Sequence, residues 1–307
     1  MKLNFLQSTK WEEFQKSQGK KTFRLKGDDF ETFAILDHTP LGDYLFCPYG
    51  PVLKNKNALE SAIKALKTLA QQQKAIFIRL EPQMYFAPNY MQKIGAKKVH
   101  DIEPAATWIL DLTSPQEEIL KGIEKEKTRL WRNSNKKGIT FRKSTDANDT
   151  KILNSLLSQV AQKNDFTPHK NKYLTDQVKS GVASLFIVEL AQDNEKAPIA
   201  ASMVYDDEDT RYYIHAAADY AHRKLGAGSS IIIEEILDAK NKGLKYFDFW
   251  GITTSTDKNH PWYGFTQFKK SYGGVEKIFS GTYDIPVNKI KYRLYSLLRP
   301  LNKLRKK

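Results

Sequence analysis

Short apolar runs separated by polar turns predict strands in the first part of the chain, and apolar residues at helical spacing predict two helices among them. Asn57 has the side chain of an N-cap, and apolar residues then recur on one helix face as far as Ala70. The run 75–80 is mostly apolar, which is typical of a buried strand. The expected strands cover residues 21–25, 31–36, 43–47, 75–80 and 107–112, and the second helix covers 89–94.

The second part of the chain repeats this order of elements. Two helices are expected within 146–180, and a glycine-containing turn at 223–228 leads into a helix that ends near Lys242, where Gly243 suits a C-cap. The expected strands cover residues 184–190, 198–205, 210–218 and 245–250. Both parts place three strands before a helix and a further strand, so we expect duplicated domains with an α/β (α+β) fold. A length of 307 residues suits two domains.

Two basic segments change this picture because they offer contacts for anions. A helix is expected to open at Ser114-Pro115 and to run to 137, and its excess of lysine and arginine leaves two interpretations open: a solvated face or an anion-binding surface. The tail 289–307 has eight basic residues and no acidic one. We expect its apolar stripe to dock on the protein itself with the basic face outward, and a membrane surface is the alternative. That stripe consists of Ile290, Leu294, Leu297, Leu298, Leu301 and Leu304.

Composition and charge narrow the classes of partner. The chain has 49 Lys+Arg against 35 Asp+Glu, so nucleic acid, phosphorylated metabolites and anionic lipids are candidate partners, and solubility alone is the alternative explanation. Cys47 is the only cysteine, which excludes an intramolecular disulfide, and we expect it in the core. The six histidines lack metal-ligand spacing, so no metal is expected. Without a signal h-region or a run of about 18 apolar residues, we expect a soluble, cytoplasmic protein.

The sharpest local motif is Arg223-x-x-Gly226-x-Gly228, which lies between a predicted strand and a predicted helix. Glycines let a backbone approach an anion closely, and a helix N-terminus offers unpaired N–H groups and a positive dipole. In this context the motif resembles the turn of GNAT acyltransferases, which holds the pyrophosphate of an acyl-CoA. A tight turn without a ligand is the alternative.

Further motifs follow one another along nearly the whole chain. They are Trp11-x-x-Phe14-Gln15-Lys16, Pro48-Tyr49-Gly50-Pro51, Arg79-Leu80-Glu81-Pro82, Asp248-Phe249-Trp250-Gly251, Gly264-Phe265-Thr266-x-Phe268-Lys269 and Gly281-Thr282-Tyr283-Asp284. In this order and spacing they resemble the Fem family (FemA, FemB and FemX) of peptidoglycan bridge-forming aminoacyltransferases. The chain lacks an insertion long enough for the helical arm of well-known members, so it resembles a compact, armless type.

The resemblance implies two tandem GNAT-like domains with mixed, mostly antiparallel sheets, and we expect domain bounds of 1–143 plus 286–307, and 144–285. It implies aminoacyl-tRNA as the donor and no further cofactor. The acceptor it implies is a peptidoglycan precursor, either UDP-MurNAc-pentapeptide or lipid II. The transferred amino acid is expected to be of the Gly, Ala or Ser class. We expect a monomer, with peripheral contact to an anionic membrane as an open option.

The same resemblance suggests roles for individual residues. Glu81 is a candidate base or amine ligand, and a strand-end cap or an ion pair with Arg79 is the alternative. Lys269 is a candidate for stabilising the oxyanion or holding the tRNA 3′ end, and a surface lysine is the alternative. Candidate substrate-binding residues are Lys16, His169, Lys170, Tyr213, Arg223, Trp250 and Tyr263, together with Tyr49 as a cleft aromatic. Candidate tRNA contacts are Lys125, Arg129, Arg132 and Lys136.

Three other functions remain open at this point. An acyl-CoA-dependent N-acyltransferase would use the Arg223–Gly228 turn. An aminoacyl-tRNA transferase acting on protein N-termini is a related option. A non-catalytic tRNA- or membrane-binding protein would account for the charge, but not for candidate site motifs at the ends of strands, where α/β folds place their ligands.

Overall fold

The computed structural model describes residues 4–164, 171–192 and 195–304, so His169 and Lys170 lie outside the described residues. Contacts divide the chain into two units. Unit 1 comprises Met1–Ala106 and Ile278–Lys307, and unit 2 comprises Thr107–Lys277. This division differs from the predicted bounds: residues 107–143 lie with unit 2, because strands at both ends of that segment belong to its sheet.

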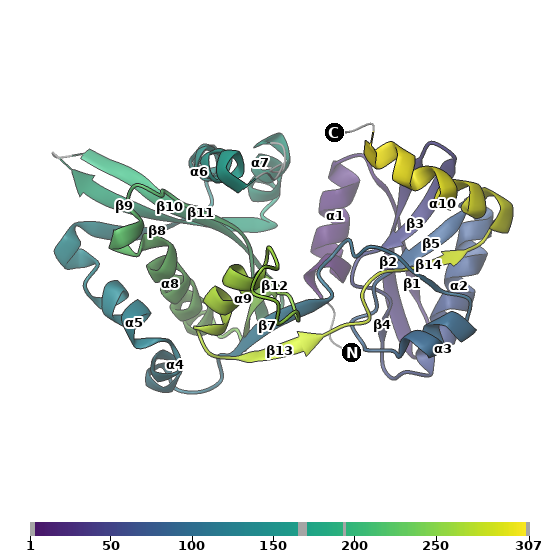
Figure 1. Cartoon of the computed structure of the whole chain (residues 1–307), viewed down its shortest axis with the longest axis horizontal. Helices are drawn as coiled ribbons and strands as arrows, with labels where there is room; N and C mark the ends of the chain where they lie inside the picture. Colours follow the sequence, from purple (N-terminus) through teal and green to yellow (C-terminus); the bar gives the residue numbers. More distant parts are fainter. Residues whose placement is uncertain (1–3, 165–170, 193–194, 305–307) are drawn as a thin grey trace. The chain divides into compact units, whose positions relative to one another are not determined.

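Unit 1 is built on a mixed sheet (Figure 1). Its strand order is β1 (Lys21–Lys26), β2 (Phe30–Thr39), β3 (Gly42–Cys47), β5 (Phe77–Leu80), β14 (Tyr283–Pro286) and β6 (Lys97–Lys98), and β4 (Val52–Leu53) pairs with β2. β3 and β5 are parallel, whereas β5 and β14 are antiparallel. The helices are α1 (Thr9–Ser17), α2 (Ala58–Gln72), α3 (Pro88–Lys93) and α10 (Lys289–Leu304).

The side chains of β5 alternate between two hydrophobic clusters of unit 1. Ile78 and Leu80 pack with the apolar face of α2, whereas Phe77 packs with Tyr292 of α10. Successive side chains of a strand point to opposite faces, so α2 and α10 lie on opposite faces of this sheet. The periodicity that predicts α2 is thus explained by its buried residues: Ala58, Leu59, Ala62, Ile63, Leu66, Leu69 and Ala70.

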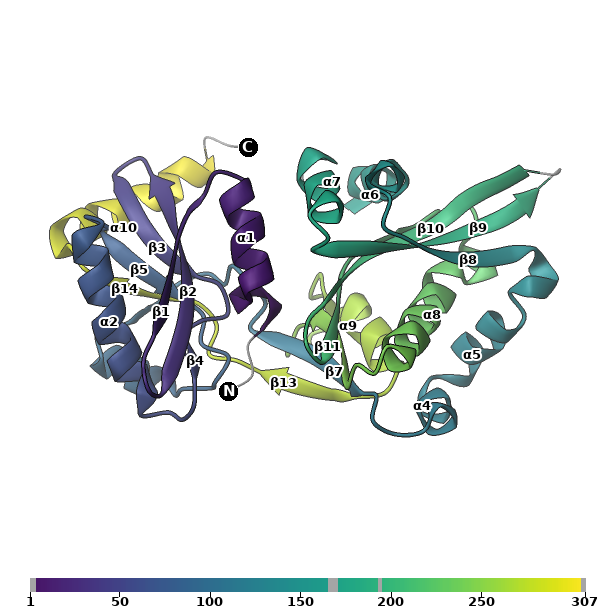
Figure 2. The ribbon, with the colours of Figure 1, turned by 180° about the vertical axis from the view of Figure 1, so that it is seen from behind.

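Unit 2 has a second mixed sheet, with helices on both of its faces (Figures 1 and 2). Its strand order is β13 (Val275–Ile278), β7 (Ala106–Asp111), β12 (Tyr246–Gly251), β11 (Thr210–Ala218), β10 (Glu195–Asp206), β9 (Ala183–Gln192) and β8 (Ile139–Ser144). β11 and β12 are parallel, and β9, β10 and β11 form an antiparallel meander. The helices are α4 (Gln116–Gly122), α5 (Lys125–Arg132), α6 (Thr150–Asn164), α7 (Asn171–Lys179), α8 (Ala227–Asn241) and α9 (Tyr263–Lys270).

The predicted class of mixed, mostly antiparallel sheets is therefore confirmed, as are the meander, the two helices before it and the core position of Cys47. The prediction of one continuous basic helix to residue 137 is wrong. The helix is interrupted between α4 and α5, where Ile123 is extended (φ −85°, ψ 143°) and buried in the core of unit 2. Burial of this side chain outweighs helical continuity, and the preceding Gly122 is a poor helix former.

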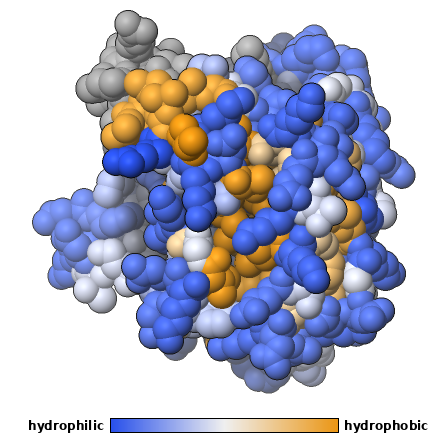
Figure 3. All heavy atoms as spheres, turned by 90° about the vertical axis from the view of Figure 1, so that its right-hand side faces the viewer, coloured by the Kyte–Doolittle hydropathy of each residue, from blue (hydrophilic) through white to orange (hydrophobic). Residues whose placement is uncertain are grey.

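The expected docking of the tail stripe is also wrong for its residues up to Leu298; the side chains of Leu301 and Leu304 lie outside the described ones. α10 attaches to unit 1 through Tyr292 and Tyr295, whereas Ile290, Leu294 and Leu297 are exposed. Figure 3 shows apolar surface gathered at the upper left of the side of unit 1 that carries α10. The aromatic face is buried because Phe77 stacks on Tyr295, with ring centroids 5.0 Å apart. Among the described helices, none is long and apolar enough to cross a membrane.

A buried ion pair joins the two strands at the centre of unit 1. Arg79 on β5 donates from Nε and Nη2 to the two carboxylate oxygens of Asp284 on β14, at 2.7 and 2.8 Å. Asp284 is fully buried and also accepts from the Tyr292 hydroxyl at 3.1 Å. The pair therefore fixes β14 and α10 to the sheet, and it excludes the ion pair between Arg79 and Glu81 that the sequence left open.

We predict that Asp284→Ala lowers the free energy of unfolding by about 3–5 kcal/mol, because it leaves a buried guanidinium without its counter-ion. Urea denaturation, with hydrogen exchange of the β5 and β14 amides, measures this. The double variant Arg79→Met/Asp284→Leu should recover most of the loss. Glu118→Ala, which removes an exposed ion pair with Lys121, is the control, and an equal loss there would contradict the prediction.

Candidate active site

In unit 1 a strained turn and a buried carboxylate meet beyond the ends of β3 and β5. The last register pair of these parallel strands is Cys47 with Leu80, so Tyr49 and Glu81 both follow the paired region. Tyr49 has φ +47°, a conformation that costs a non-glycine residue about 1–3 kcal/mol. Its backbone N–H donates to Oε2 of Glu81 at 3.5 Å. Carboxyl ends of parallel strands are where α/β folds place ligands.

The Glu81 carboxylate holds several segments of unit 1 together. Oε1 accepts from the Thr282 hydroxyl at 2.6 Å and from the backbone N–H groups of Glu103 and Ile102 at 3.0 and 3.3 Å. The side chain is only 2% exposed, and burial raises its pKa, although these hydrogen bonds favour the ionised form and oppose the rise. Burial and the nearby charge of Glu81 raise the pKa of Glu103 to about 8.

Gln7 supports this turn from behind. Its side-chain amide donates to the carbonyl oxygens of Pro48 at 2.6 Å and Phe33 at 3.2 Å, and accepts from the Phe33 N–H at 2.7 Å. A Cβ atom at Gly50 would lie 2.6 Å from Nε2 of Gln7. A side chain at position 50 would therefore displace the Gln7 amide from the hydrogen bonds that hold this turn.

Unit 2 contains a similar arrangement at the end of β12. Trp250 has φ +63°, and its N–H donates to Oδ1 of Asp248 at 2.7 Å. The Thr107 hydroxyl of β7 donates to the same oxygen. Asp248 is buried, which raises its pKa, and the register of β12 against β7 shifts between Asp248 and Gly251. Thus a buried carboxylate and a threonine hydroxyl stabilise a positive-φ aromatic residue near a parallel strand pair in each unit.

Lys269 on α9 lies beside this end of β12. Its Nζ donates to the Gly251 carbonyl oxygen at 2.7 Å and lies 3.9 Å from the centroid of the Phe265 ring. The side chain is 2% exposed, so the alternative interpretation as a surface lysine is wrong. Burial lowers the pKa of Lys269 to about 7, and the charge of Asp248 opposes this shift. The amine is therefore poised to change protonation near neutrality.

A cavity of ≈ 350 Å³ opens in unit 2 where β11 continues past its pairing with β12. The parallel register covers only residues 210–212 of β11, and the cavity is lined by residues further along that strand. Those residues of β11 are Tyr213 and the alanines 216–218. Arg223, Gly226 and Gly228 of the predicted anion-binding turn also line the cavity, as do Phe265 and Phe268 of α9. The start of α8 therefore borders a cavity, as expected for a ligand-binding turn.

The geometry of this turn explains its glycine. Gly226 has φ +74° and is the N-cap of α8, and a Cβ atom there would lie 2.7 Å from the Leu130 side chain of α5. Glycine is thus needed at position 226 both for its positive φ and for packing against Leu130. Arg223 is exposed, and its guanidinium lies 4.2 Å from the centroid of the Tyr220 ring. The structure places Arg223 and Tyr213 around one cavity, whereas Lys269 lies nearby on α9.

The remaining predicted residues occupy other positions. Lys16 on α1 has a side chain 57% exposed and forms an ion pair with Glu12, 2.9 Å away. Tyr263 begins α9 and is half-buried. The predicted tRNA contacts all lie on the exposed surface of α5 and the following turn: Lys125, Arg129, Arg132 and Lys136.

Sequence reasoning missed several residues that shape these sites. Thr282 lies within one of the motifs that resemble the Fem family, and Gln7 lies in the opening run Phe5-Leu6-Gln7-Ser8, yet the motifs predict no role for either residue. Thr107 and Glu103 give no local signal, because their partners are distant in sequence. Among the described residues, no group of three or more His, Cys, Asp and Glu side chains could hold a metal ion.

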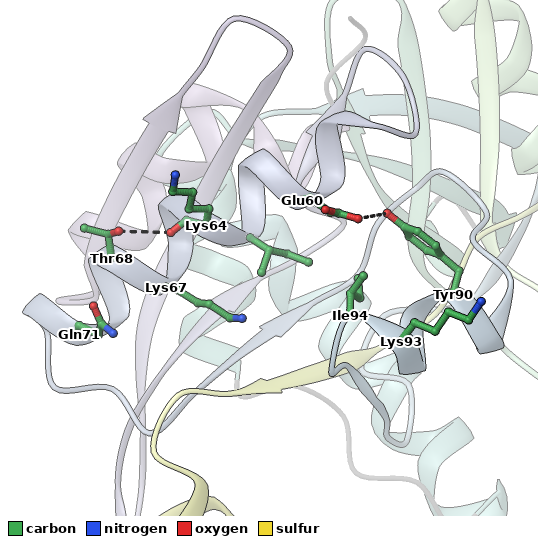
Figure 4. Close-up of a pocket in the computed structure, with 9 residues that line it drawn as sticks. Glu60, Lys64, Lys67, Thr68, Gln71, Tyr90, Lys93 and Ile94 are labelled. Atoms are coloured by element: carbon green, nitrogen blue, oxygen red, sulfur yellow. Dashed lines mark hydrogen bonds between the residues drawn. The ribbon is translucent and has the colours of Figure 1, made fainter.

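A second hollow of ≈ 740 Å³ lies in unit 1 between α2 and α3 (Figure 4). It combines the apolar side chains of Ile63 and Ile94 with the lysines 64, 67 and 93. Figure 4 shows Lys67 extending toward Ile94 and Glu60 hydrogen-bonded to the Tyr90 hydroxyl, a distance of 3.2 Å. We call this hollow the basic groove.

Comparisons with known proteins place this fold in a defined family. The model of the FemAB family matches residues 1–100 and 182–300. A lipid II:glycine glycyltransferase of Staphylococcus haemolyticus is 21% identical over 383 aligned positions, covering 97% of this chain and 91% of that protein. The crystal structure of FemX has a TM-score of 0.82 at 19% identity, covering 96% of this chain and 94% of that one. A tandem GNAT protein from the clavulanic acid biosynthesis pathway has a TM-score of 0.50 at 12% identity, covering 87% and 83% of the two chains.

The two units thus form a tandem GNAT-like fold, and the chain belongs to the FemAB family. The alignment with the glycyltransferase spans more positions than the 307 residues of this chain, so that relative carries insertions which this chain lacks. The longest described helix has 16 residues, which agrees with a compact type without a long helical arm.

We predict that Lys269 makes the stability of unit 2 depend on pH. The unfolded amine titrates near 10.5 and the folded one near 7, so between these values the unfolded chain binds more protons. The free energy of unfolding therefore rises with pH in this window, by at most about 1.4 kcal/mol per pH unit. Below about pH 7 the amine is protonated in both states, and the destabilisation by its buried charge has reached its full extent.

Urea denaturation of the wild type and Lys269→Met at pH 6 to 10 measures this effect. The variant should gain most at pH 6, and its advantage should shrink as the pH rises. Lys270→Met removes the neighbouring, half-buried lysine and should keep the pH dependence of the wild type. A constant difference between wild type and Lys269→Met would contradict a lowered pKa.

Proposed function

We propose that this chain transfers an amino acid of the Gly, Ala or Ser class from aminoacyl-tRNA to the stem-peptide amine of a peptidoglycan precursor. The chain is an amide-forming transferase of peptidoglycan biosynthesis, in line with its family and its curated relatives. The observation that carries the proposal is the match of both units to the FemAB family, together with a relative named for glycyl transfer to lipid II.

The reaction forms a C–N bond and breaks the ester C–O bond to the tRNA ribose. The acceptor amine attacks the aminoacyl carbonyl as a neutral nucleophile, loses a proton, and the ribose oxygen leaves with a proton. A general base and stabilisation of the developing oxyanion accelerate such a step. No covalent enzyme intermediate is needed, and Cys47 is unsuited to one because burial raises its pKa to about 12.

Lys269 is the proposed electrostatic residue. In its protonated form the Nζ group offers hydrogens beyond the one donated to Gly251, and low solvent exposure strengthens its field at a nearby oxyanion. Glu81 is the proposed base or amine ligand. Oε1 already accepts three hydrogen bonds, so an acceptor amine would use Oε2, which has one long bond to Tyr49.

The donor is proposed to lie along α5 and in the cavity at the start of α8. Arg132 at the end of α5 and Lys136 in the following turn are exposed, and Trp131 fixes α5 to α8 by donating to Glu234 at 2.6 Å. Phosphates of the tRNA acceptor stem can bind the exposed cations. The cavity of ≈ 350 Å³ has room for the aminoacyl end.

The acceptor is proposed to be UDP-MurNAc-pentapeptide or lipid II, with Lys16 as a contact for the diphosphate. His169 and Lys170 are the other proposed contacts and lie outside the described residues. We propose that the protein acts as a monomer without a further cofactor. A lipid-linked acceptor requires contact with a membrane surface, whereas the nucleotide precursor does not.

The decisive experiment incubates the purified chain with Gly-, Ala- or Ser-charged tRNA and each acceptor. Mass spectrometry should show a gain of one amino acid on one acceptor, and the gain should disappear after RNase treatment. No gain on either acceptor with any of the three tRNAs would overturn the proposal.

An acyl-CoA donor is the second candidate, favoured by the cavity beside the Arg223–Gly228 turn. Isothermal titration with CoA and acetyl-CoA distinguishes the two donors. Binding that Arg223→Ala weakens would support the acyl-CoA reading, whereas absence of binding would leave aminoacyl-tRNA as the donor.

We predict that Thr282→Val displaces the acidic limb of the pH profile of kcat/KM to higher pH. The Thr282 hydroxyl stabilises the ionised Glu81, so its loss raises the pKa of Glu81 further, and a base must be ionised to act. Single-turnover rates from pH 5 to 9 measure the shift. Thr68→Val, at an exposed position of α2, is the control, and an unmoved acidic limb in Thr282→Val would exclude Glu81 as the base.

A further inference from the structure

We propose that the exposed apolar face of α10 docks this protein on an anionic lipid bilayer. The docking face consists of Ile290, Leu294, Leu297 and Leu298, which are 84, 47, 65 and 37% exposed. Their spacing places them on one stripe of the helix. The inference deepens the proposed function, since a lipid-linked acceptor lies in a membrane, but vesicle binding can be measured without any transfer reaction.

The opposite face of α10 fixes the orientation of this stripe. Tyr292 is 3% exposed, donates to Asp284 at 3.1 Å and packs edge-on against Phe77, with centroids 5.4 Å apart. Tyr295 stacks on Phe77, and its hydroxyl accepts from Arg79 at 3.4 Å. Rotating the helix to bury the leucines would break these contacts, so the fold itself holds the apolar face outward.

Positive charges flank the docking face. At 3.6 residues per turn, Lys291 lies on one side of the stripe, and Lys289 and Arg293 lie on the other. All three are exposed, and the sequence from 289 to 307 contains no acidic residue. A helix with an apolar stripe between basic flanks lies in the interface of an anionic membrane, with the stripe inserted and the cations at the head groups.

The surroundings add to this charge. Lys97 of β6 is exposed and its Nζ lies 5.2 Å from the centroid of the Tyr292 ring, so it places a further cation beside α10. Figure 3 shows hydrophilic residues around apolar surface on this side. α10 therefore presents apolar side chains between cations, and anionic lipid is the partner whose chemistry complements both features.

A second copy of this chain fits the docking face less well. Two α10 helices packed stripe to stripe would bring their basic flanks together, and residues 289–307 supply no acidic partner. Like charges placed across an interface oppose association.

Co-sedimentation of the full chain with vesicles tests the proposal. Vesicles of phosphatidylcholine with about 30% phosphatidylglycerol should bind the wild type at least tenfold more tightly than vesicles of phosphatidylcholine alone, because bound cations gain from anionic lipid. The double variant Leu294→Gln/Leu297→Gln should lose at least tenfold in binding. Lys291→Glu/Arg293→Glu should abolish the preference for anionic vesicles.

The matched control is Val275→Gln/Ile278→Gln, which replaces two exposed apolar residues of β13 (67 and 47% exposed) and should bind vesicles like the wild type. Circular dichroism checks that all variants are folded. No binding by the wild type, or equal binding by Leu294→Gln/Leu297→Gln, would overturn the proposal. Absence of vesicle binding together with a dimer that this variant dissociates would also overturn it, in favour of self-association.

The transfer reaction separates this inference from the proposed function. Leu294→Gln/Leu297→Gln should retain transfer to lipid II dissolved in detergent and lose transfer to lipid II in vesicles. If the wild type binds vesicles but transfers nothing, the proposed function fails while the docking face stands.

Discussion

A buried carboxylate that holds a strained aromatic residue is the interaction on which both candidate sites depend. Glu81 accepts the N–H of Tyr49, and Asp248 accepts the N–H of Trp250, and both aromatic residues have positive φ. A threonine hydroxyl donates to each carboxylate. Such strain, about 1–3 kcal/mol per residue, persists only where surrounding contacts determine the backbone, and it concentrates at functional sites. The two units thus stabilise a positive-φ aromatic residue in the same way, with residues at different positions in their sheets.

Burial also sets the chemistry of these sites. It raises the pKa values of Glu81 and Asp248 and lowers that of Lys269 to about 7, because a low-dielectric environment disfavours each charged form. Groups that are ordinarily fully ionised are thereby brought closer to changing protonation near neutrality. An acyl-transfer enzyme needs such groups, since a base must accept a proton and a cation must meet a transient oxyanion. Membership of the FemAB family and these shifted groups thus point to the same class of reaction.

The Arg79–Asp284 pair connects the candidate site of unit 1 with its proposed membrane surface. It joins β5, which leads directly into Glu81, to β14, which follows Thr282 and precedes α10. The same aspartate accepts from Tyr292 and so orients the helix. One buried charge therefore helps to position the carboxylate and to keep the leucines of α10 outward. This structural role explains why Asp284 is fully buried although its partner Arg79 is distant in sequence.

The sequence by itself determined most of the local elements, the duplicated order of strands and helices, and the family. Strand and helix periodicity is a local property, and the order of short motifs survives at low identity. The sequence could not decide which face of α10 is buried, because aliphatic and aromatic faces compete and the outcome depends on Phe77 and Asp284. Nor could it identify Thr282 as a partner of Glu81, or the burial of Lys269. Those properties arise from contacts between residues distant in sequence, and only the tertiary structure brings such residues together.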